Sequence, residues 1–319
     1  MGTGTTADLQ GGPREPPAPT RPYRGRFAPS PTGPLHFGSL LAAAGSWLDA
    51  RAARGEWLLR IEDIDPPREV PGAAEDIIRA LDAFGLWWDG DVVFQSRRSE
   101  AHVAGLQRLL DLGWAYPCLC TRKSIAAANR RRDRPDDTSY PGTCRSLPPS
   151  AAKRTRVVRA LTTSEPIEIK DRLQDGFTQV LEMDPGDFVL RRRDGLIAYQ
   201  LAVVVDDYEQ GVTDVVRGVD LLDSTPRQRW LQTLLGYPEP RYMHLPVIVQ
   251  PDGAKLSKQT GARAVATSDP GTTAWQALKC LGQEPPAELR GAAPVELWDW
   301  ALAHWSPQHL AGIRNIQMP

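Results

Sequence analysis

The sequence predicts an α/β protein built around a parallel sheet of Rossmann type. From residue 23 onwards, short β-like runs alternate with helical segments, several of which end at a glycine, as at Gly55, Gly85 and Gly113. A loop containing three prolines joins the first strand to the first helix. Strands that alternate with helices favour parallel pairing through crossover connections. The alternation is interrupted over residues 95–187, which predicts an inserted domain.

Composition and charge are those of an ordinary globular protein. The 319 residues suffice for about two domains, and the net charge of −1 gives no general preference for polyanions. Four cysteines in a chain of this length do not indicate a disulfide scaffold. No apolar run approaches the ~20 residues that span a bilayer, and no signal pattern opens the chain. We therefore expect a cytoplasmic, monomeric protein that does not associate with membranes.

Changes in composition and rhythm divide the chain into five parts. Residues 1–21 are rich in glycine, proline and threonine, and predict a disordered tail. The Rossmann-like domain is expected in two halves, residues 22–94 and 188–260, with the insertion at 95–187 between them. Residues 261–319 predict a small helical C-terminal domain whose last nine residues form an ordinary tail.

The first half of the α/β domain shows a clear order of elements. Its β-like runs and amphipathic segments predict strands at residues 23–27, 56–61 and 91–94, and helices at 40–54 and 73–84, with a further helix at 99–112 near the start of the insertion. The helix at 73–84 places Ile77, Ile78, Leu81 and Phe84 on one stripe. Asp63 and Asp65 follow the second strand, where we interpret them as structural residues at the strand end.

The second half is predicted from similar signals. The strongly apolar run at 196–205 ends in Asp206 and Asp207, which we interpret as capping a strand end. Ser224 supplies a capping hydroxyl ahead of Pro226, so a helix should begin there. Further β-like runs lie at 157–161, 178–181, 214–216 and 244–249, and helices are expected at 275–281 and 294–304.

The loop over residues 26–39 is the first candidate functional segment. Its prolines stiffen the chain, and it delivers His36 and Gly38 to the start of a helix. A helix N-terminus presents free N–H groups and suits phosphate, and a glycine lets a ligand approach the backbone. The loop therefore predicts a nucleotide site, with a simple turn before an N-capped helix as the alternative.

Lys255 and Lys258 form the second candidate segment. They follow the turn-forming sequence Pro-Asp-Gly and lie three residues apart, so that both could meet a polyphosphate and neutralise charge developing during displacement. A pair of this kind is ordinarily a solvated surface. Its combination with the first loop makes it specific.

Together these segments resemble the two signature motifs of class I aminoacyl-tRNA synthetases, in the form of the glutamyl branch. The first has His-Phe-Gly-Ser in place of His-Ile-Gly-His, and the second has Lys-Leu-Ser-Lys-Gln. Three further stretches match glutamyl-tRNA synthetases: Arg60-Ile-Glu-Asp-Ile-Asp, Tyr199-Gln-Leu-Ala-Val-Val-Val-Asp-Asp and Val216-Arg-Gly-Val-Asp. The resemblance covers about residues 22–260 and implies a class I catalytic domain with an inserted acceptor-type domain.

The resemblance implies amino-acid adenylation, in which a substrate carboxylate attacks the α-phosphate of ATP and pyrophosphate leaves. His36, Gly38, Ser39 and Lys258 would bind ATP, and His36, Lys255 and Lys258 would be catalytic. Mg²⁺ would accompany the ATP, although the sequence shows no dedicated motif for it.

A glutamate substrate carries one cation and two carboxylates, so its site needs an anionic residue and guanidinium groups. By the resemblance, Glu62 would take the α-ammonium, and Arg26 and Arg217 would take carboxylates, with Arg217 at the side-chain end. Ser30 and Tyr199 would add hydrogen bonds, and the same site would include the residues between Arg26 and Ser30, which are Phe27, Ala28 and Pro29. The alternative role of Arg217 is a structural salt bridge with Asp214 or Asp220.

Three cysteines, Cys118, Cys120 and Cys144, cluster in the insertion and suggest a four-coordinate zinc ion. No histidine lies between residues 103 and 243, so the fourth ligand is of another kind, and physical chemistry alone favours water, Asp136 or Asp137. The pattern C-x-C…Y-x-x-x-C resembles the zinc site of glutamyl-queuosine tRNA(Asp) synthetases, which implies Tyr140. The implied zinc is structural, one per chain, and the alternative is three free thiols.

The implied function follows from the length and from these motifs. About sixty residues after the second lysine motif are too few for an anticodon-binding module in addition to a small helical domain. The chain therefore resembles the glutamyl-queuosine family, which activates L-glutamate with ATP without tRNA and esterifies it to queuosine at the wobble position of tRNA(Asp). A minimal glutamyl-tRNA synthetase and a non-catalytic RNA-binding paralogue are the alternatives. Basic runs at 130–134, 153–156 and 191–193 could contact RNA or be solvated charge.

Overall fold

The computed structural model describes residues 21–132, 136–147, 157–250, 256 and 263–318. The predicted tail (except residue 21), the turn at 251–253 and the two lysines Lys255 and Lys258 lie outside these described residues. So do residues 133–134 of one basic run and the whole of the run at 153–156.

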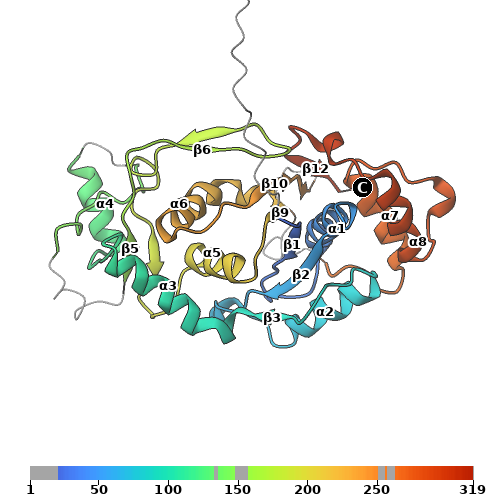
Figure 1. Ribbon diagram of the computed structural model, residues 1–319, viewed down its shortest axis with the longest axis horizontal. Helices are drawn as coiled ribbons and strands as arrows, with labels where there is room; N and C mark the ends of the chain where they lie inside the picture. Colours follow the sequence, from blue (N-terminus) through green and yellow to red (C-terminus); the bar gives the residue numbers. More distant parts are fainter. Residues whose placement is uncertain (1–20, 133–135, 148–156, 251–255, 257–262, 319) are drawn as a thin grey trace, which may run out of the picture.

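Eight α-helices and twelve β-strands are described (Figure 1). The helices are α1 (Phe37–Ala52), α2 (Ala73–Ala83), α3 (Ser99–Asp111), α4 (Arg122–Arg130), α5 (Tyr199–Glu209), α6 (Thr225–Leu235), α7 (Pro270–Cys280) and α8 (Pro294–His304). The strands are β1 (Arg24–Phe27), β2 (Glu56–Ile61), β3 (Val93–Phe94), β4 (Ala115–Pro117), β5 (Val158–Ala160), β6 (Ile167–Ile169), β7 (Phe177–Gln179), β8 (Val189–Arg191), β9 (Asp214–Gly218), β10 (Arg241–Leu245), β11 (Val247–Val249) and β12 (Asn315–Gln317).

The predicted parallel sheet is confirmed. Strands β1, β2 and β3 pair in parallel in that order, and β9 pairs in parallel with β10. The two groups adjoin at their first residues, because the Thr213 N–H donates to the Arg24 carbonyl at 2.9 Å. All five strands therefore run in one direction, and their carboxyl ends lie at one edge of the molecule.

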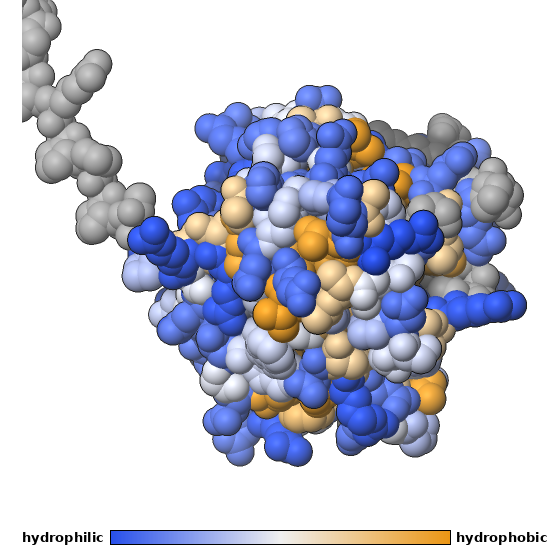
Figure 2. Space-filling model, turned by 90° about the vertical axis from the view of Figure 1, so that its right-hand side faces the viewer, coloured by the Kyte–Doolittle hydropathy of each residue, from blue (hydrophilic) through white to orange (hydrophobic). Residues whose placement is uncertain are grey.

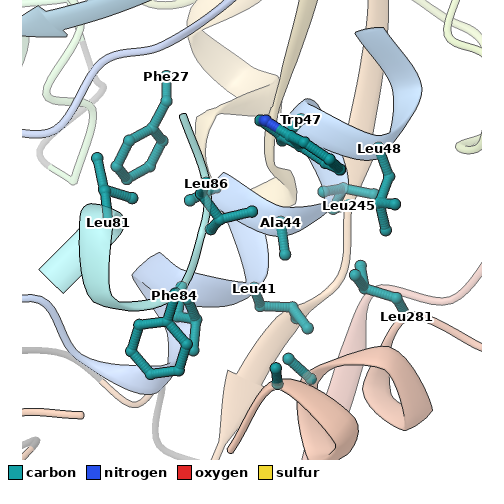
Figure 3. Packing of buried hydrophobic residues seen from close by; sticks show 14 of the residues in the cluster. Phe27, Leu41, Ala44, Trp47, Leu48, Leu81, Phe84, Leu86, Leu245 and Leu281 are labelled. Atoms are coloured by element: carbon teal, nitrogen blue, oxygen red, sulfur yellow. The ribbon is translucent and has the colours of Figure 1, made fainter. Parts of the chain in front are cut away.

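Helix α1 forms the centre of the main hydrophobic core. Its buried residues share a hydrophobic cluster with side chains from the sheet and from α7, and Figure 3 shows Leu245 of β10 and Leu281, which follows α7, close together beside the helix. Gly45 permits this close approach, since a Cβ at that position would lie 2.5 Å from Leu245 Cδ1. Trp298 of α8 joins the same core and donates its indole N–H to the Phe84 carbonyl at 2.7 Å. The C-terminal helices thus pack directly on the α/β unit.

The insertion has its own antiparallel strands. Strands β4, β5 and β8 form one sheet, and β6 and β7 form a hairpin. Their apolar side chains share a second core with α3, α5 and α6. The β6 strand runs along one side of the molecule toward β10 (Figure 1), and Asp171 just beyond it forms a parallel bridge with Tyr242.

Three sequence-based expectations are wrong. The apolar run at 196–205 belongs to the buried helix α5, so Asp206 and Asp207 lie inside a helix and not at a strand end; a short buried run has no periodicity that distinguishes the two. Ser224 makes no side-chain cap bond, because its hydroxyl accepts from Gln200 Nε2 at 3.1 Å. The end of the chain is not a simple tail, since β12 pairs with β11.

The expected strand at 244–249 is interrupted at Pro246, which cannot donate a ladder hydrogen bond, and forms β10 and β11. Within the described residues, no helix has the length and apolar character needed to cross a membrane. Figure 2 shows that the face formed by α7, α8 and their surroundings is mostly hydrophilic, with hydrophobic residues in small groups.

Asp187 anchors the cysteine-containing segment to the insertion sheet. Its fully buried carboxylate accepts hydrogen bonds from Tyr116, from Arg145 at 2.7 Å and from the Thr162 hydroxyl at 2.7 Å. Burial raises the pKa of Asp187, but the Arg145 and Tyr116 hydrogen bonds outweigh it and hold that pKa below its usual range. Arg145 also pairs with Glu182, whose side chain is 38% exposed.

We expect Asp187→Asn to lower the free energy of unfolding at neutral pH by about 1.5–3 kcal/mol, because the partly buried Arg145 guanidinium and the Tyr116 and Thr162 hydroxyls lose a fully buried, charged acceptor. The folded-state pKa of Asp187 is depressed, so its contribution is present above the unfolded value of about 3.9 and lost as pH falls below it. The free energy of unfolding, measured with denaturant at several pH values, should therefore fall less steeply toward acid pH in the variant. Glu182→Gln is the control and should change stability by less than ~1 kcal/mol. Equal losses in the two variants would contradict the role of Asp187.

Candidate active site

A cavity of about 690 Å³ opens at the carboxyl ends of β1, β2 and β9. Its lining contains every described residue that the sequence assigned to ATP or glutamate binding, from four segments that are separate in the chain. These are Arg26, Phe27, Ala28, Pro29, Ser30, His36, Gly38, Ser39, Glu62, Tyr199 and Arg217. Ligands of open parallel sheets bind at this edge, so the position itself favours a ligand site.

The proline-rich loop and the residue after β2 are fixed to each other. The Glu62 N–H donates to the Pro29 carbonyl at 2.9 Å, and the Thr32 N–H donates to the Ser30 carbonyl at 2.8 Å. The first bond extends the β1–β2 pairing by one step beyond the strands. It places the Glu62 side chain at the same end of the cavity as Arg26.

His36 is the N-cap of α1. Its Nδ1 accepts from the Ser39 N–H at 3.2 Å, so the ring proton lies on Nε2, which faces the Ser39 hydroxyl at 3.0 Å. A Cβ on Gly38 would lie 3.3 Å from this ring and 3.7 Å from the Leu256 carbonyl. Leu256, the described residue of the second lysine motif, donates its N–H to the Ile248 carbonyl and lines the cavity. The two motifs therefore meet here.

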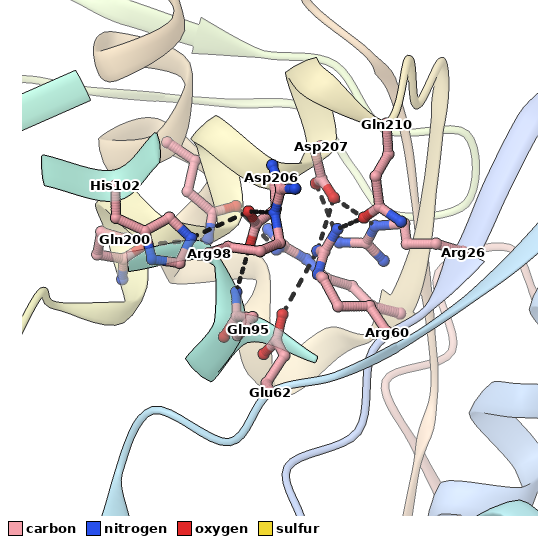
Figure 4. A network of polar contacts seen from close by, with 12 residues as sticks. Arg26, Arg60, Glu62, Gln95, Arg98, His102, Gln200, Asp206, Asp207 and Gln210 are labelled. Atoms are coloured by element: carbon pink, nitrogen blue, oxygen red, sulfur yellow. Dashed lines mark hydrogen bonds and ion pairs between the residues drawn. The ribbon is translucent and has the colours of Figure 1, made fainter. Parts of the chain in front are cut away.

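A network of buried charged side chains includes Arg26 and Glu62 of the cavity lining (Figure 4). Asp207 accepts from Arg26 through Nε at 3.1 Å and Nη2 at 3.3 Å, and from Arg60 Nη2 at 2.7 Å. Arg60 also pairs with Glu62 at 3.4 Å. Burial tends to raise the pKa of Asp207, but the two guanidinium groups lower it below its ordinary value. For Glu62, burial dominates and its pKa is raised, so a cationic ligand would favour its ionised form.

Asp206, the neighbour of Asp207, helps to hold α5 in place. Its buried carboxylate accepts from Gln95 at 2.8 Å, from Arg98 at 2.5 Å and from His102 at 3.0 Å. These contacts tie α5 to the segment before α3. Asp63 and Asp65, interpreted from the sequence as structural, contact Ser96 and the pair Arg68 and Arg192 respectively.

Arg217 lies on β9 and is 5% exposed. Its guanidinium donates to His244 Nε2 at 3.0 Å, Gln228 Oε1 at 2.8 Å, the Thr225 hydroxyl at 2.9 Å and the Leu221 carbonyl at 3.4 Å. These four acceptors are uncharged, and four of the five N–H groups suffice for them.

The sequence offered Asp214 and Asp220 as structural partners of Arg217, and the four hydrogen bonds described above go to neither of them. Asp214 pairs with Arg241 at 2.8 Å, and Asp220 lines the same cavity as Arg217. Tyr199, the first residue of α5, also lines this cavity. Burial is the main cause of its raised pKa, and the nearby Arg217 charge opposes that shift, so the phenol remains protonated and able to donate.

The predicted metal ligands come together in the insertion. The Sγ atoms of Cys118, Cys120 and Cys144 lie within 4.8 Å of one another, with 3.4 Å between those of Cys120 and Cys144. The Tyr140 hydroxyl lies 3.4 Å from Cys118 Sγ and 3.8 Å from Cys120 Sγ. Ligands about 2.3 Å from a tetrahedral zinc are separated by roughly 3.7 Å, so the spacing fits such an ion. Among the described residues, no other group of three His, Cys, Asp or Glu side chains has such a spacing.

Sequence reasoning missed the residues that hold Arg217, namely His244, Gln228 and Thr225, and the carboxylate of Asp171 behind His244. His244 is 27 positions from Arg217, and Asp171, in the insertion, is 73 positions from His244. Of these residues, only His244 could have been expected beside Arg217 from the sequence. It lies on β10, the strand that follows β9 and α6, and strands joined by a helix in this way are commonly neighbours.

Comparisons with known proteins agree with this geometry. Residues 23–279 match the catalytic-domain family of class I tRNA synthetases for E and Q. The chain is 55% identical to the glutamyl-Q tRNA(Asp) synthetase of Dechloromonas aromatica, over 89% of this chain and 94% of that protein. It is 56% identical to the protein of the same name from Chromobacterium violaceum, with the same coverage. A crystal structure of glutamate-tRNA synthetase from Elizabethkingia anophelis aligns with a TM-score of 0.77 and 26% identity, over 92% of this chain and 68% of that one. The chain belongs to the glutamyl-Q tRNA(Asp) synthetases, within the class I tRNA synthetase catalytic-domain family.

Proposed function

We propose that this chain activates L-glutamate with ATP in the absence of tRNA and transfers the glutamyl group to queuosine at the wobble position of tRNA(Asp). Two relatives at 55% and 56% identity carry the name glutamyl-Q tRNA(Asp) synthetase. The observation that carries the proposal is that Glu62, Arg26 and Arg217 line one cavity together with the N-terminus of α1, in a lining whose other charged side chains are Arg68 and Asp220.

The polar end of the cavity matches the charges of glutamate. Arg60 and Asp207 compensate each other, and Glu62 and Arg26 lie beside them. Glu62 would take the α-ammonium, which offsets the cost of burying its carboxylate. Arg26 binds Asp207 through Nε and Nη2, so Nη1 is the group that would reach a substrate carboxylate. Arg217, whose described hydrogen bonds go to uncharged groups, would bind the side-chain carboxylate.

The other end suits ATP. The N-terminus of α1 carries a partial positive charge and free N–H groups, and His36 and Gly38 lie on its first turn. Lys255 and Lys258 flank Leu256, which lines the same cavity, and they would stabilise the leaving pyrophosphate. Mg²⁺ would arrive with the nucleotide and spread the phosphate charge.

The two chemical steps use this one cavity. An oxygen of the glutamate α-carboxylate would attack the α-phosphorus of ATP, and pyrophosphate would leave. A hydroxyl of the queuosine cyclopentene diol would then attack the carbonyl carbon of glutamyl-adenylate, releasing AMP. The main contribution of the protein is to hold the reacting groups in line and stabilise the developing charge.

We further propose that Cys118, Cys120, Tyr140 and Cys144 hold one structural zinc ion. The spacing of the three sulfur atoms and the phenol fits tetrahedral ligands, and four protein ligands leave no open position for catalysis. The Arg159 guanidinium lies 3.9 Å over the Tyr140 ring and donates to Cys118 Sγ at 3.3 Å. Its positive charge would offset part of the negative charge that the ligand set brings.

The acceptor is tested by comparing tRNA(Asp) that carries queuosine with tRNA(Asp) that carries guanosine at the same position. We expect labelled glutamate to be transferred to the first and not to the second, because only queuosine has the cyclopentene diol. A chain that charges the tRNA 3′ end would load both equally, and that result would refute the proposal. Absence of glutamate-dependent ATP–pyrophosphate exchange would favour the non-catalytic alternative.

Arg217→Gln should raise the KM for glutamate in ATP–pyrophosphate exchange by roughly 10- to 150-fold, the range for lost hydrogen bonds to a charged group. The KM for ATP should stay within about twofold, since Arg217 lies at the opposite end from His36. Arg229→Gln is the matched control, because Arg229 pairs with Glu239 away from the cavity. If both KM values rose together in Arg217→Gln, its assignment to the glutamate carboxylate would be wrong.

Tyr140→Phe should weaken zinc binding by more than the roughly 10- to 100-fold that outer ligand contacts contribute, because it removes a direct ligand. Competition with a chromophoric chelator measures this affinity. Tyr116→Phe is the control, since the Tyr116 hydroxyl binds Asp187 and not the cysteine cluster. Unchanged affinity in Tyr140→Phe would exclude the phenol as a ligand and leave water or a carboxylate as the fourth group.

A further inference from the structure

Behind the proposed glutamate site, three buried side chains form a linear chain of hydrogen bonds. Arg217 Nε donates to His244 Nε2 at 3.0 Å, and His244 Nδ1 lies 2.6 Å from Asp171 Oδ2. The side chains of His244 and Asp171 are fully buried, and Arg217 is 5% exposed. Only Arg217 of the three reaches the cavity lining.

The geometry fixes the protons along this chain. Arginine Nε can only donate, so His244 Nε2 must be an acceptor and the ring proton must lie on Nδ1. That proton is donated to Asp171, which is therefore ionised. The imidazole is neutral in this arrangement, in keeping with its pKa, which burial lowers below the ordinary value and Arg217 lowers further against the effect of Asp171.

Local structure holds both partners in place. His244 and Arg217 are register partners on the parallel strands β10 and β9, so their side chains leave the sheet side by side. Asp171 Oδ1 accepts from the N–H groups of Leu173, Gln174 and His244 at 2.9, 2.9 and 3.2 Å. These contacts orient the other oxygen, Oδ2, toward the imidazole.

We propose that Asp171 and His244 are positioning residues that set the orientation of the Arg217 guanidinium for the side-chain carboxylate of glutamate. Asp171 selects the histidine tautomer, and His244 presents an acceptor to Nε. Because Gln228, Thr225 and Leu221 accept three further N–H groups, the second N–H on Nη1 is the one directed to the cavity. This inference rests on the proposed function, because it concerns the residue proposed to recognise the substrate side chain. Since Asp171 follows β6, the insertion contributes to amino-acid recognition without touching the amino acid.

The first test compares two amides at position 244. Glutamine can place its amide oxygen near the position of Nε2 and still accept from Arg217, whereas asparagine reaches only the position of Nδ1 and leaves Arg217 Nε without an acceptor. We expect His244→Asn to raise the KM for glutamate in ATP–pyrophosphate exchange by roughly 10- to 100-fold and His244→Gln by only a few-fold. The KM for ATP should change by less than about twofold in both.

The second test changes the tautomer. Asp171→Asn keeps an oxygen for the backbone N–H groups but turns an NH₂ group toward His244 Nδ1, so the ring should move its proton to Nε2. Two N–H groups would then face each other between His244 and Arg217, and the KM for glutamate should rise as in His244→Asn. In the His244→Gln background the same Asp171→Asn change should have a much smaller effect.

Nitrogen-15 NMR of labelled histidine reads the tautomer independently of activity. The chain has five histidines, and the signals missing from His244→Gln identify His244. We expect a proton on Nδ1 in the parent protein and on Nε2 in Asp171→Asn. Met243→Ala is the stability control, because Met243 is buried on the same strand but does not line the cavity. It should lower the melting temperature and leave the glutamate KM unchanged.

The outcomes separate the two proposals. If the parent protein does not exchange pyrophosphate with glutamate, the proposed function fails, while the NMR result still decides the tautomer. If it does exchange and the two amides at position 244 have equal effects, or Asp171→Asn leaves the glutamate KM unchanged, the positioning role is refuted. An Nε2–H or doubly protonated His244 in the parent protein would also refute it.

Discussion

The burial of arginine side chains is the constraint on which the rest of the structure depends. Arg26, Arg60 and Arg217 are all 5% exposed or less, and an unpaired ion in such a position costs several kcal/mol. Asp207 compensates the first two, because a single carboxylate accepts from both guanidinium groups. Helix α5 must therefore lie with Asp207 toward β1 and β2, and this orientation also turns Asp206 toward α3. The buried charges thus fix how the two halves of the α/β domain meet across the insertion.

The same constraint gives the cavity its chemical character. Arg26 and Arg60 share a carboxylate partner within the protein, whereas the described hydrogen bonds of Arg217 go to uncharged acceptors. A buried cation held only by dipoles retains much of its capacity to bind an anion, since dipoles orient it without cancelling its charge. At the other end, the N-terminus of α1 is capped by a neutral His36 ring, so no carboxylate competes with phosphate there. The cavity is therefore suited to two anionic groups at separate positions.

Local signals in the sequence predicted the parallel sheet, several of the helices and the eleven residues assigned to the cavity, because strand periodicity, glycine stops and signature motifs act over a few neighbouring positions. The failures occur where partners are distant. The run at 196–205 is helical because Asp206 and Asp207 must face two different sets of buried cations, which periodicity does not reveal. The support of Arg217 by His244 and Asp171 depends on strand register and on where the insertion returns to the sheet. The strand β12 exists because β11 offers a free edge, which its own sequence does not show.

The insertion carries the cysteine cluster, and its β6–β7 region also forms hydrogen bonds and ion pairs with the catalytic unit at several independent points. Arg172 forms a bidentate pair with Asp49 of α1, and Gln174 donates to the carbonyls of His244 and Ile313. Asp171 directly precedes these residues and itself accepts from the N–H groups of Leu173, Gln174 and His244, so it cannot shift without breaking buried hydrogen bonds. The cysteine cluster is separated from this region by the Asp187 network, which holds the opposite end of the insertion. A displacement of the insertion would therefore reach Arg217 in the cavity through Asp171 and His244, whereas a disturbance at the cysteine cluster would act first on the segment that Asp187 anchors.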